Sequence, residues 1–577
     1  MKGTFFAAGL IAAASATSVS SSNPFTNSTA ASCAKKCKPF TIDVTRGASD
    51  GSKLISRDSI LVNGTIPGPP LKLNVGDCVD FLVYNNMQDV TSVHFHGIRQ
   101  LDTPWSDGTP GLSQSAIASG ASYNYRWTAD EPGVYFYHSH YKGQMMDGLY
   151  GAIIISADDS VAKPFSAISS SASDIAAMQK AEANVETILT SDWNQFTFNE
   201  VFNFEQAANI DFACTDSIIL NGQGSTYCLS QADLAANERP QVPQILGNQT
   251  LTAKGCIPPQ NPLIQGNYNR NYAAIPSGAY DVCTPHSVKN YTYTVDAADK
   301  WAAISFISPA GFAILTATID SHSLYVYELN GAYITPQKVD QVTMSPGDRV
   351  SFFVKLDQPA ADYTIRVAND GINQVVSGFG VLSYKGSKGA SSSAVALMNY
   401  GGVSSNNATI TALNPAAAAP FSAEAPAGSV DKTFVLDIMK NPDETESWSW
   451  VLNGLTPYSQ SNDDQTPFLY AGPDNIPASD LVLRTNYNDW VDLIVKVAGP
   501  LAEPHPIHKH ANKFFVIGEG TGDFNYSSVS AAQSAGVSFN LVNPPYVDGY
   551  TSIPAEGSGS WMVFRYQANT PGAWFMQ

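Results

Sequence analysis

Cysteine is absent from the second half of this chain. The seven cysteines among its 577 residues include no Cys-x-x-Cys pair, which argues against a structural zinc site. In an oxidising compartment most of them should form disulfides, and the odd count leaves one thiol free or paired outside the chain. Sequence alone does not give the pairing. The cysteines stand at positions 33, 37, 78, 214, 228, 256 and 283.

Basic residues are also scarce. Lysine and arginine together number 31 against 50 aspartates and glutamates, so the net charge at pH 7 is −19. A protein of this charge repels the phosphates of nucleic acids and of anionic lipids, and we expect neither as a partner. Only 14% of the residues are charged, while 43 glycines and 35 prolines provide for many turns, a composition typical of all-β proteins.

Long apolar runs are missing except near the N-terminus. Residues 1–16 combine Lys2, an apolar stretch from Phe5 onward and the small residues Ala14-Ser15-Ala16, which is the pattern of a cleavable secretion signal. The stretch is too short for a membrane anchor, and no later segment could span a bilayer. We therefore expect a secreted protein, extracellular or in the cell wall, without a membrane partner. Six glycosylation sequons agree with this, at Asn27, Asn63, Asn248, Asn290, Asn407 and Asn525.

Internal repeats divide the chain into three similar units. A turn followed by a strand of alternating polarity occurs at residues 75–83, 346–354 and 488–495. An Asn-Gly turn precedes each block, at Asn63-Gly64, Asn221-Gly222 and Asn453-Gly454. Three copies predict three Greek-key β-sandwich domains in an all-β fold.

A second repeat closes each unit with a strand that follows a proline. These closing strands begin at Pro132-Gly133, at Pro571-Gly572 and, in degenerate form, at Pro359-Ala360. In the third unit Gln577 stands where the first has His138, so we expect the third domain to be truncated at its C-terminal end.

Composition places the boundaries between the units. We expect domains at residues 37–158, 183–400 and 432–577, with a helix at 173–182 in the first connector. Residues 401–431 are rich in Ala, Ser, Asn and Pro, which predicts a surface linker.

Seven of the nine histidines lie in three clusters: His94-Phe95-His96, His138-Ser139-His140 and His505-Pro506-Ile507-His508-Lys509-His510. On a strand, His-x-His places two imidazoles on one face, about 7 Å apart, where they can bind one metal or two adjacent metals. Imidazole suits copper, zinc, iron or nickel, so the spacing does not choose the metal. Because the clusters are far apart in sequence, they predict that the chain folds back and joins its ends around a common metal centre.

The same motifs, together with Trp105-Ser106-Asp107-Gly108, resemble in order and context the copper motifs of the multicopper oxidases, and in detail those of laccase-like enzymes of filamentous fungi. The resemblance covers nearly the whole chain. It implies three cupredoxin-like domains and, in the family as a whole, four copper ions. One is a type 1 copper in the third domain, and three form a cluster between the first and third domains.

Carried over residue by residue, the resemblance implies that His94 and His508 bind the type 2 copper and that His505 binds the type 1 copper. It implies type 3 ligands at His96, His138, His140 and His510. The family's fourth motif, a His-Cys-His segment that supplies the type 1 thiolate, is not found in these 577 residues. The chain would then hold four of the six type 3 ligands, both type 2 ligands and one of the three type 1 ligands.

Two carboxylates are candidates beside these ligands. Asp107 resembles the residue that orients water and supplies protons near the copper cluster, although an Asp-Gly turn would also explain it. Asp216 resembles the acidic residue that some laccases place at the substrate pocket, and a helix or turn cap is the alternative.

The resemblance implies a monomeric copper-dependent oxidoreductase of laccase type. Such an enzyme oxidises phenols or pigment precursors one electron at a time and reduces dioxygen to water. A ferroxidase of the same family is one alternative, although it would usually carry a membrane anchor. The other alternative is a non-catalytic copper-binding relative or a truncated gene product, because the type 1 cysteine is missing.

Overall fold

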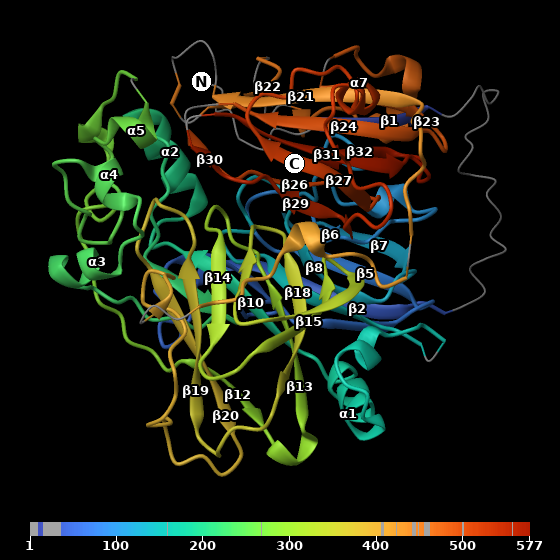
Figure 1. The fold of residues 1–577 in the computed structure, drawn as a ribbon. Coiled ribbons are helices and arrows are strands. Elements are labelled where there is room, and N and C mark those ends of the chain that lie inside the picture. The colour runs from blue at the N-terminus through green and yellow to red at the C-terminus, as the bar shows by residue number, and fades with distance from the viewer. Residues whose placement is uncertain are drawn as a thin grey trace.

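The computed structural model is built almost entirely of strands, arranged in three domains (Figure 1). The third domain forms the top of that view and the second domain the bottom, while the first domain lies between them at the right. The structure describes residues 10–15, 36–158, 160–266, 268–405, 409–422, 424–440, 446–447, 449–454, 462–479, 481–498, 501–556 and 558–577. Most of the predicted signal (1–9 and 16), Cys33, and the sequons at Asn27 and Asn407 lie outside these ranges.

One sheet with a common set of pairings recurs in all three domains. In the first domain β2 (Lys38–Ala48) runs antiparallel to β3 (Asp58–Val62) and parallel to β5 (Cys78–Asn85), which pairs with β7 (Ser122–Thr128). The same order β3-β2-β5-β7 recurs in the other two domains. The equivalents are β11 (Ser217–Leu220), β10 (Glu186–Trp193), β13 (Trp301–Ile307) and β18 (Arg349–Lys355) in the second domain, and β22 (Trp450–Leu452), β21 (Lys432–Lys440), β24 (Trp490–Val497) and β31 (Ser560–Gln567) in the third. Strands β15 (Leu324–Leu329) and β16 (Ala332–Val339) extend the second domain's sheet, and β27 (Phe514–Thr521) and β28 (Tyr546–Val547) extend the third domain's.

The second sheet of each domain carries the histidine motifs or their counterparts. In the first domain its order is β4-β9-β8-β6, and in the second β12-β20-β19-β14-β17. In the third domain β23-β1-β32 forms the corresponding sheet. The strands of the first domain's second sheet are β4 (Leu71–Asn74), β9 (Tyr150–Ser156), β8 (Gly133–His138) and β6 (His94–His96). Those of the second domain are β12 (Tyr291–Val295), β20 (Ser377–Tyr384), β19 (Asp362–Asn369), β14 (Leu315–Ile319) and β17 (Val342–Met344). Those of the third domain are β23 (Val482–Asn486), β1 (Leu10–Ser15) and β32 (Ala573–Met576). Short pairs complete the third domain: β25 (Leu501–Ala502) with β30 (Ala555–Glu556), and β26 (Pro506–His508) with β29 (Gly549–Thr551).

Strand β1 belongs to the segment predicted as a secretion signal. It runs parallel to β23 and antiparallel to β32, just as β9 runs parallel to β4 and antiparallel to β8 in the first domain. The apolar N-terminal stretch thus occupies, in the third domain, the position of the strand that follows the closing strand in the first.

The Asn-Gly turns behave alike in the three domains. Asn63, Asn221 and Asn453 all have left-handed backbone conformations, with φ of 50°, 47° and 54°. Each side-chain oxygen accepts a backbone N–H from the first strand of its domain, so the asparagine locks the turn to the sheet. This local chemistry explains why the pattern recurs.

One correspondence expected from the repeats is wrong. Residues 346–354 form the turn and strand β18, which takes the place of β7 and β31 rather than of β5 and β24. The true counterpart of β5 is β13. A tight turn leading into an alternating strand has the same local sequence requirements at either place, and only the pairing partners distinguish them.

Helices are few and short. The expected helix at 173–182 is confirmed as α1 (Ala172–Glu182), capped by Ser171. The longest helix that we did not predict, α2 (Phe198–Ala208), begins with a reciprocal capping box between Thr197 and Glu200, a signal present in the sequence. No helix among the described residues is long and apolar enough to cross a membrane. The remaining helices are α3 (Gln231–Asn237), α4 (Val242–Leu246), α5 (Pro262–Gln265), α6 (Phe468–Ala471) and α7 (Val529–Ser534).

The domains are tied together by packing. Buried apolar side chains of the second and third domains form one continuous cluster, whereas the first domain has its own core around Phe81, Phe95 and Trp127. The predicted surface linker is partly packed: Leu413 and Ala418 are buried, and Leu413 N–H donates to the carbonyl of Gln341. Three disulfides, Cys37–Cys78, Cys214–Cys256 and Cys228–Cys283, account for every cysteine among the described residues.

Candidate metal centre

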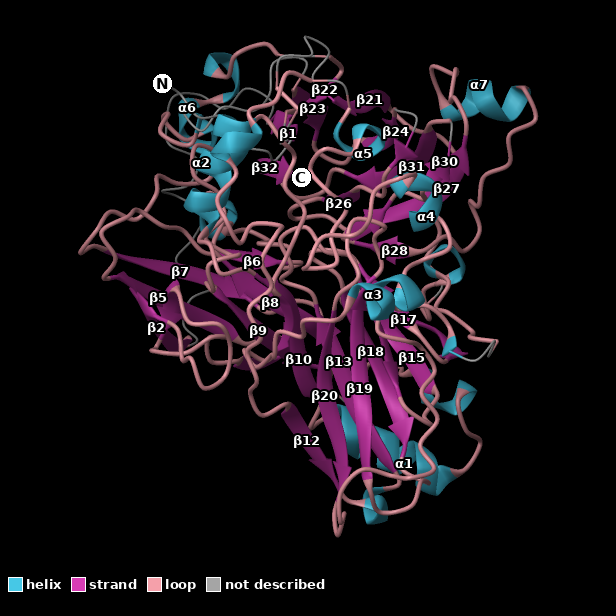
Figure 2. Cartoon of the chain, turned by 90° about the vertical axis from the view of Figure 1, so that its left-hand side faces the viewer, coloured by secondary structure: helices cyan, strands magenta, loops and turns pink. Residues whose placement is uncertain are grey.

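Six of the seven clustered histidines meet at the interface of the first and third domains. Strands β6 and β8 approach β26 in the middle of the molecule (Figures 1 and 2). The ring of His94 stacks on that of His510 with centroids 3.8 Å apart, and the ring of His96 stacks on that of His508 at 3.6 Å. His138 and His140 complete the group, with ring centroids 5.4 and 5.5 Å from His94. The structure therefore brings these rings together across more than 350 residues of sequence.

The two domains present their histidines in the same way. In the first domain His94 lies opposite His138 in the β6–β8 ladder. In the third, His508 exchanges both backbone hydrogen bonds with Gln577, at 2.6 and 3.0 Å. Gln577 therefore occupies the position that His138 has in the first domain, and it lines the same cavity as His140.

Hydrogen bonds fix which nitrogen of each ring faces inward. Nδ1 of His94 lies 2.7 Å from the carbonyl of Asp107, and Nδ1 of His508 lies 2.8 Å from the carbonyl of Asp548. A carbonyl can only accept, so in both rings Nδ1 carries the proton and Nε2 carries the free lone pair. The Nε2 atoms of five rings are buried without a hydrogen-bond partner: His94, His96, His140, His508 and His510.

Buried nitrogens without a partner are costly unless something binds them. Ligand atoms of His94, His96 and His508 lie within 4.8 Å of one another, and so do those of His94, Asp107 and His510. The structure contains no ions, but this donor set suits a metal that prefers imidazole nitrogen, copper among them.

Burial favours the uncharged form of five of these imidazoles. Desolvation, reinforced by neighbouring rings, lowers the pKa of His508 to about 3 and of His140 to about 4. The same causes hold the pKa of His96, His138 and His510 well below the usual value. Neutral imidazole is the form that binds metal, so the site is ready for ligation near neutral pH.

Asp107 contacts histidines of both domains. It follows a 3-10 turn, Pro104–Ser106, and is fully buried. Its backbone carbonyl accepts from His94, while its carboxylate accepts from Nδ1 of His510 at 2.9 Å and from the hydroxyl of Thr109 at 2.7 Å. Burial alone would raise the pKa of this carboxyl, but the adjacent His510 and His94 hold it well below its usual range.

The turn role expected for Asp107 also applies. Gly108 has φ of +84°, and a Cβ at this position would come within 1.8 Å of the carbonyl oxygen of Val93. The Asp-Gly turn is thus what brings the carboxylate against the rings of His94 and His510.

His505 stands apart from the other six. It borders an apolar cavity of about 230 Å³, and its ring lies 4.7 Å from that of Trp450. Its Nε2 is buried without a partner, and burial lowers its pKa to about 4. The described residues that line this cavity include no cysteine; they are Leu436, Ile438, Trp450, Leu452, Val495, His505, Pro506, Ile507, Met576 and Gln577.

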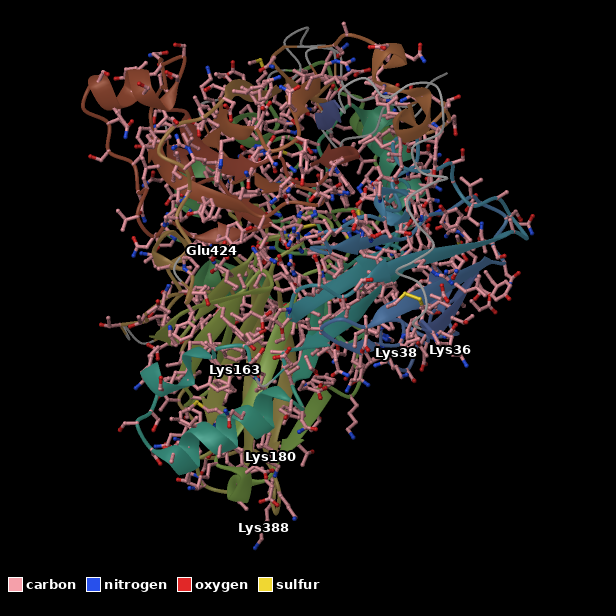
Figure 3. All side chains as sticks on the ribbon, turned by 90° about the vertical axis from the view of Figure 1, so that its right-hand side faces the viewer. Lys36, Lys38, Lys163, Lys180, Lys388 and Glu424 are labelled. Atoms are coloured by element: carbon pink, nitrogen blue, oxygen red, sulfur yellow. A yellow bond between two sulfur atoms is a disulfide. The ribbon has the colours of Figure 1, made fainter. Side chains whose placement is uncertain are left out.

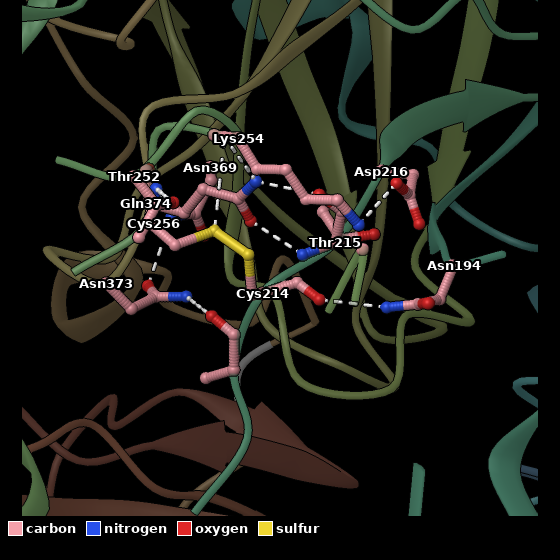
Figure 4. Close-up of a disulfide and its surroundings, with 12 residues drawn as sticks. Asn194, Cys214, Thr215, Asp216, Thr252, Lys254, Cys256, Asn369, Asn373 and Gln374 are labelled. Carbon is pink, nitrogen blue, oxygen red and sulfur yellow. Dashed lines mark hydrogen bonds and ion pairs between the residues drawn. A yellow bond between two sulfur atoms is a disulfide. The ribbon is translucent and has the colours of Figure 1, made fainter. Parts of the chain in front are cut away.

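The structure places Asp216 elsewhere. Its carboxylate forms a buried ion pair with Lys254 at 2.5 Å beside the Cys214–Cys256 disulfide (Figure 4). It also accepts the N–H of Gln195. Most lysines, such as Lys38, Lys180 and Lys388, lie on the surface (Figure 3), whereas Lys254 is buried. Asp216 lines neither the histidine cavity nor the cavity beside His505.

Two other carboxylates lie near His505. The charge of Asp211 acts on His505. Glu503 is half-buried two residues before His505, and desolvation raises its pKa to about 7. Asp211 also pairs with Lys440, whose ammonium lies 4.4 Å from the centre of the Trp450 ring. We did not single out either carboxylate from the sequence, although Asp211 is only five residues from Asp216.

A buried carboxylate also joins the first and second domains. Glu328 of β15 accepts the N–H of Val134 at 2.8 Å, at the start of the strand that leads to His138. Burial raises the pKa of Glu328 to about 7.

This raised pKa predicts a stability that depends on pH. The folded state holds the Glu328 proton more tightly than the unfolded chain, so the stabilisation is complete below pH 4.5 and is lost as the pH rises through 7. The loss amounts to about 3 kcal/mol at 1.36 kcal/mol per tenfold change in proton affinity. Glu328→Gln should therefore raise the melting temperature at pH 8 and leave it unchanged at pH 4. An equal effect at both pH values would contradict this reading.

Comparison with known proteins identifies the family. Models of the multicopper oxidase family match residues 43–160, 184–387 and 449–577. The chain is 43% identical to multicopper oxidase elcG of Phaeosphaeria nodorum, covering 93% of this chain and 87% of that protein. It is 38% identical to laccase abr2 of Aspergillus fumigatus, covering 93% and 91%.

Solved structures share the fold. The laccase of Botrytis aclada superposes with a TM-score of 0.64 at 22% identity, covering 94% of this chain and 84% of that one. Fet3p, a multicopper oxidase that functions in iron import, gives 0.61 at 20% identity, with coverage of 94% and 87%. The fold and the site define an all-β, cupredoxin-like oxidoreductase. The chain belongs to the multicopper oxidase family, and copper is the metal that this membership implies.

Proposed function

We propose that this protein is a secreted, monomeric copper oxidase of laccase type. It would oxidise phenols or phenolic pigment precursors one electron at a time and reduce dioxygen to water. The observation that carries the proposal is the convergence of six histidines at the interface of the first and third domains. Five of the six side chains are buried, and five have an unpartnered Nε2. The laccases among its relatives support the choice of substrate class.

The ligand roles are those that the family resemblance implies. His94 and His508 would bind the type 2 copper, and His505 the type 1 copper. His96, His138, His140 and His510 would bind the type 3 pair. Bound copper supplies one-electron redox chemistry, by which electrons from a reducing substrate reach dioxygen.

The chain's own residues orient these ligands and handle protons. The carbonyls of Asp107 and Asp548 retain the Nδ1 protons of His94 and His508, so that Nε2 of each ring faces inward. The second carboxylate oxygen of Asp107 is buried without a hydrogen-bond partner 3.4 Å from Nδ1 of His94. The ionised carboxylate can there orient a water molecule that delivers protons for oxygen reduction. A phenol that loses an electron also loses its O–H proton, and Asp211 and Glu503 are the carboxylates near His505 that can accept it.

Replacing a type 2 ligand should remove copper without unfolding the protein. In His94→Ala or His508→Ala we expect the copper content to fall, measured per mole of protein by metal analysis after reconstitution. His322→Gln is the matched control, because His322 is also buried but bonds Tyr384 and the carbonyl of Asp320 in the second domain. Full copper in both alanine variants would refute the type 2 assignment.

Iron(II) oxidation is the second candidate function. The acidic side chains of Asp211 and Glu503 near His505 favour it, because carboxylate oxygen suits a hard cation better than an apolar pocket does. The two functions separate in one assay on the chain extended after Gln577 by a His-Cys-His segment: oxygen consumption with a phenol and with Fe²⁺ as alternative electron donors. A preparation that consumes oxygen only with Fe²⁺ would replace the laccase proposal.

A further inference from the structure

A buried ion pair lies at the junction of the three domains. Arg349 is the first residue of β18 in the second domain, and Asp548 lies between β28 and β29 in the third. The guanidinium donates twice to the carboxylate, at 2.8 Å and 2.5 Å. The exposed fractions of the two side chains are 0% and 3%, so the pair is shielded from water.

The other donors of the same guanidinium reach the remaining domains. Nε of Arg349 donates to the carbonyl of Val134 in β8 of the first domain, at 3.3 Å, and one terminal nitrogen donates to the carbonyl of Gly347 at 3.0 Å. Asn330 supports the backbone, because its side chain accepts the N–H of Arg349 and donates to the carbonyl of Gly549 in the third domain. One side chain therefore binds all three domains at once.

The pair is in contact with the metal-binding histidines. The carbonyl of Asp548 accepts from Nδ1 of His508 at 2.8 Å and from the N–H of Lys509 at 3.0 Å. Strand β8, which Arg349 holds at Val134, ends at His138. Arg349 therefore holds the Asp548 backbone that contacts His508 and the strand β8 that carries His138.

Two glycines show how close this approach is. A Cβ at Gly97, the residue after His96, would come within 2.5 Å of the Asp548 carboxylate and 2.7 Å of the Arg349 guanidinium. A Cβ at Gly347 would come within 2.9 Å of the His96 ring. Both glycines have φ near +90°, which other residues rarely adopt. The ion pair thus packs against the chain on both sides of the stacked His96 and His508 rings.

Stability alone is a poor explanation for such a pair. Desolvating two charges offsets most of their attraction, so a buried ion pair contributes little net stability compared with apolar residues of the same size. What it does provide is a fixed geometry, because a guanidinium and a carboxylate meet in only a few arrangements. Here that geometry is passed to His508 through the Asp548 carbonyl.

We propose that Arg349 is a positioning residue of the metal centre: paired with Asp548, it aligns the third domain's His508 against the first domain's His96 and His138. The inference rests on the proposed binding of copper by these histidines. It assigns to the second domain, which contributes no histidine ligand, the task of holding the two ligand-bearing domains in register.

The test compares two arginine-to-lysine variants. Arg349→Lys keeps the positive charge but cannot form the two parallel hydrogen bonds of the guanidinium to Asp548. Loss of a group that supports a metal-binding histidine typically weakens metal binding by about 10–100-fold. Arg565→Lys is the matched control, because the Arg565–Asp492 pair is equally bidentate, at 2.6 and 2.9 Å, and equally buried, but joins β24 to β31 within the third domain. Copper affinity is measured by competition with a chelator, and the hyperfine splitting of bound Cu²⁺ by electron paramagnetic resonance.

We expect Arg349→Lys to bind copper at least tenfold more weakly with an altered hyperfine splitting, and Arg565→Lys to lose comparable thermal stability with affinity and spectrum unchanged. If Arg349→Lys does not fold, Asp548→Asn replaces it, since it keeps the carbonyl that contacts His508 and removes only the charge pairing. Wild-type affinity and spectrum in the variant tested, or equal losses in the Arg565 control, would overturn the positioning role. A wild-type chain that binds no copper would instead refute the proposed function itself.

Discussion

The 577-residue chain, loaded with copper, is expected to lack the intense blue thiolate-to-copper absorption and to show little oxygen consumption with a phenol. A type 1 site needs a thiolate beside His505, and the six cysteines that the structure describes are all in disulfides. The residues described around the His505 cavity supply one imidazole and otherwise apolar groups. Without the thiolate, electrons have no efficient route from the substrate to the histidine cluster.

A gain-of-function experiment tests the same point. The chain can be fused after Gln577 to a His-Cys-His segment of the kind that the family resemblance implies, and the matched control carries Ser in place of that Cys. We expect the fusion to gain the blue absorption and oxygen consumption, and the Ser control to gain neither. A blue, active preparation of the 577-residue chain, with its C-terminus verified by mass spectrometry, would show that electrons enter by another route. If the protein is a non-catalytic copper-binding relative, neither the 577-residue chain nor the fusion should gain the blue absorption.

Removing the Asp107 side chain should have the second-largest effect. Asp107→Ala takes away the acceptor for Nδ1 of His510 and the buried carboxylate oxygen beside His94. We expect copper affinity to fall by about 10–100-fold, as is typical when the partner of a ligating histidine is lost. In an active fusion, oxygen reduction should slow by about 10²–10⁴-fold, because the ionised carboxylate no longer orients the water that delivers protons.

Asp192→Ala is the control for Asp107. Asp192 is also a buried carboxylate, but it accepts three backbone N–H groups in the second domain, from Gly311, Phe312 and Ala313. Its loss should lower stability and leave copper affinity as it is. Asp107→Asn separates charge from geometry, because the amide oxygen can still accept from His510. Equal copper affinity in Asp107→Ala and the wild type would show that Asp107 does not support the metal centre.

The histidine clusters were predictable because their information is local. Alternation along a strand places His94 and His96, or His508 and His510, on one face whatever lies further away. The Asn-Gly turns were predictable for the same reason. Asn63 has the left-handed backbone conformation that such a turn needs, and asparagine is one of the few residues that adopt it readily.

Features that depend on strand pairing were less predictable. Residues 346–354 were matched to the wrong strand, since the sequence of a turn does not say which neighbour its strand will meet. The contact between Asp107 and His510 spans 403 positions and follows only from the docking of two domains. For the same reason Arg349 and Asp548 gave no signal: a buried charge cannot be distinguished from an exposed one before its partner is known.

The role of Asp216 stays a prediction. The resemblance implies that it lies at the substrate pocket, and the structure pairs it with Lys254 in the second domain. The carboxylates that do lie near His505, Asp211 and Glu503, come from two segments that meet only in the folded protein.

The central claim is that histidines from the first and third domains share one copper cluster. The most direct measurement is an anomalous-difference map, recorded at the copper absorption edge, from crystals of the copper-loaded protein. The account predicts copper peaks in the space enclosed by His94, His96, His138, His140, His508 and His510, with at least one peak ligated from both domains. Copper-loaded crystals without density there, or with every peak ligated by a single domain, would contradict it.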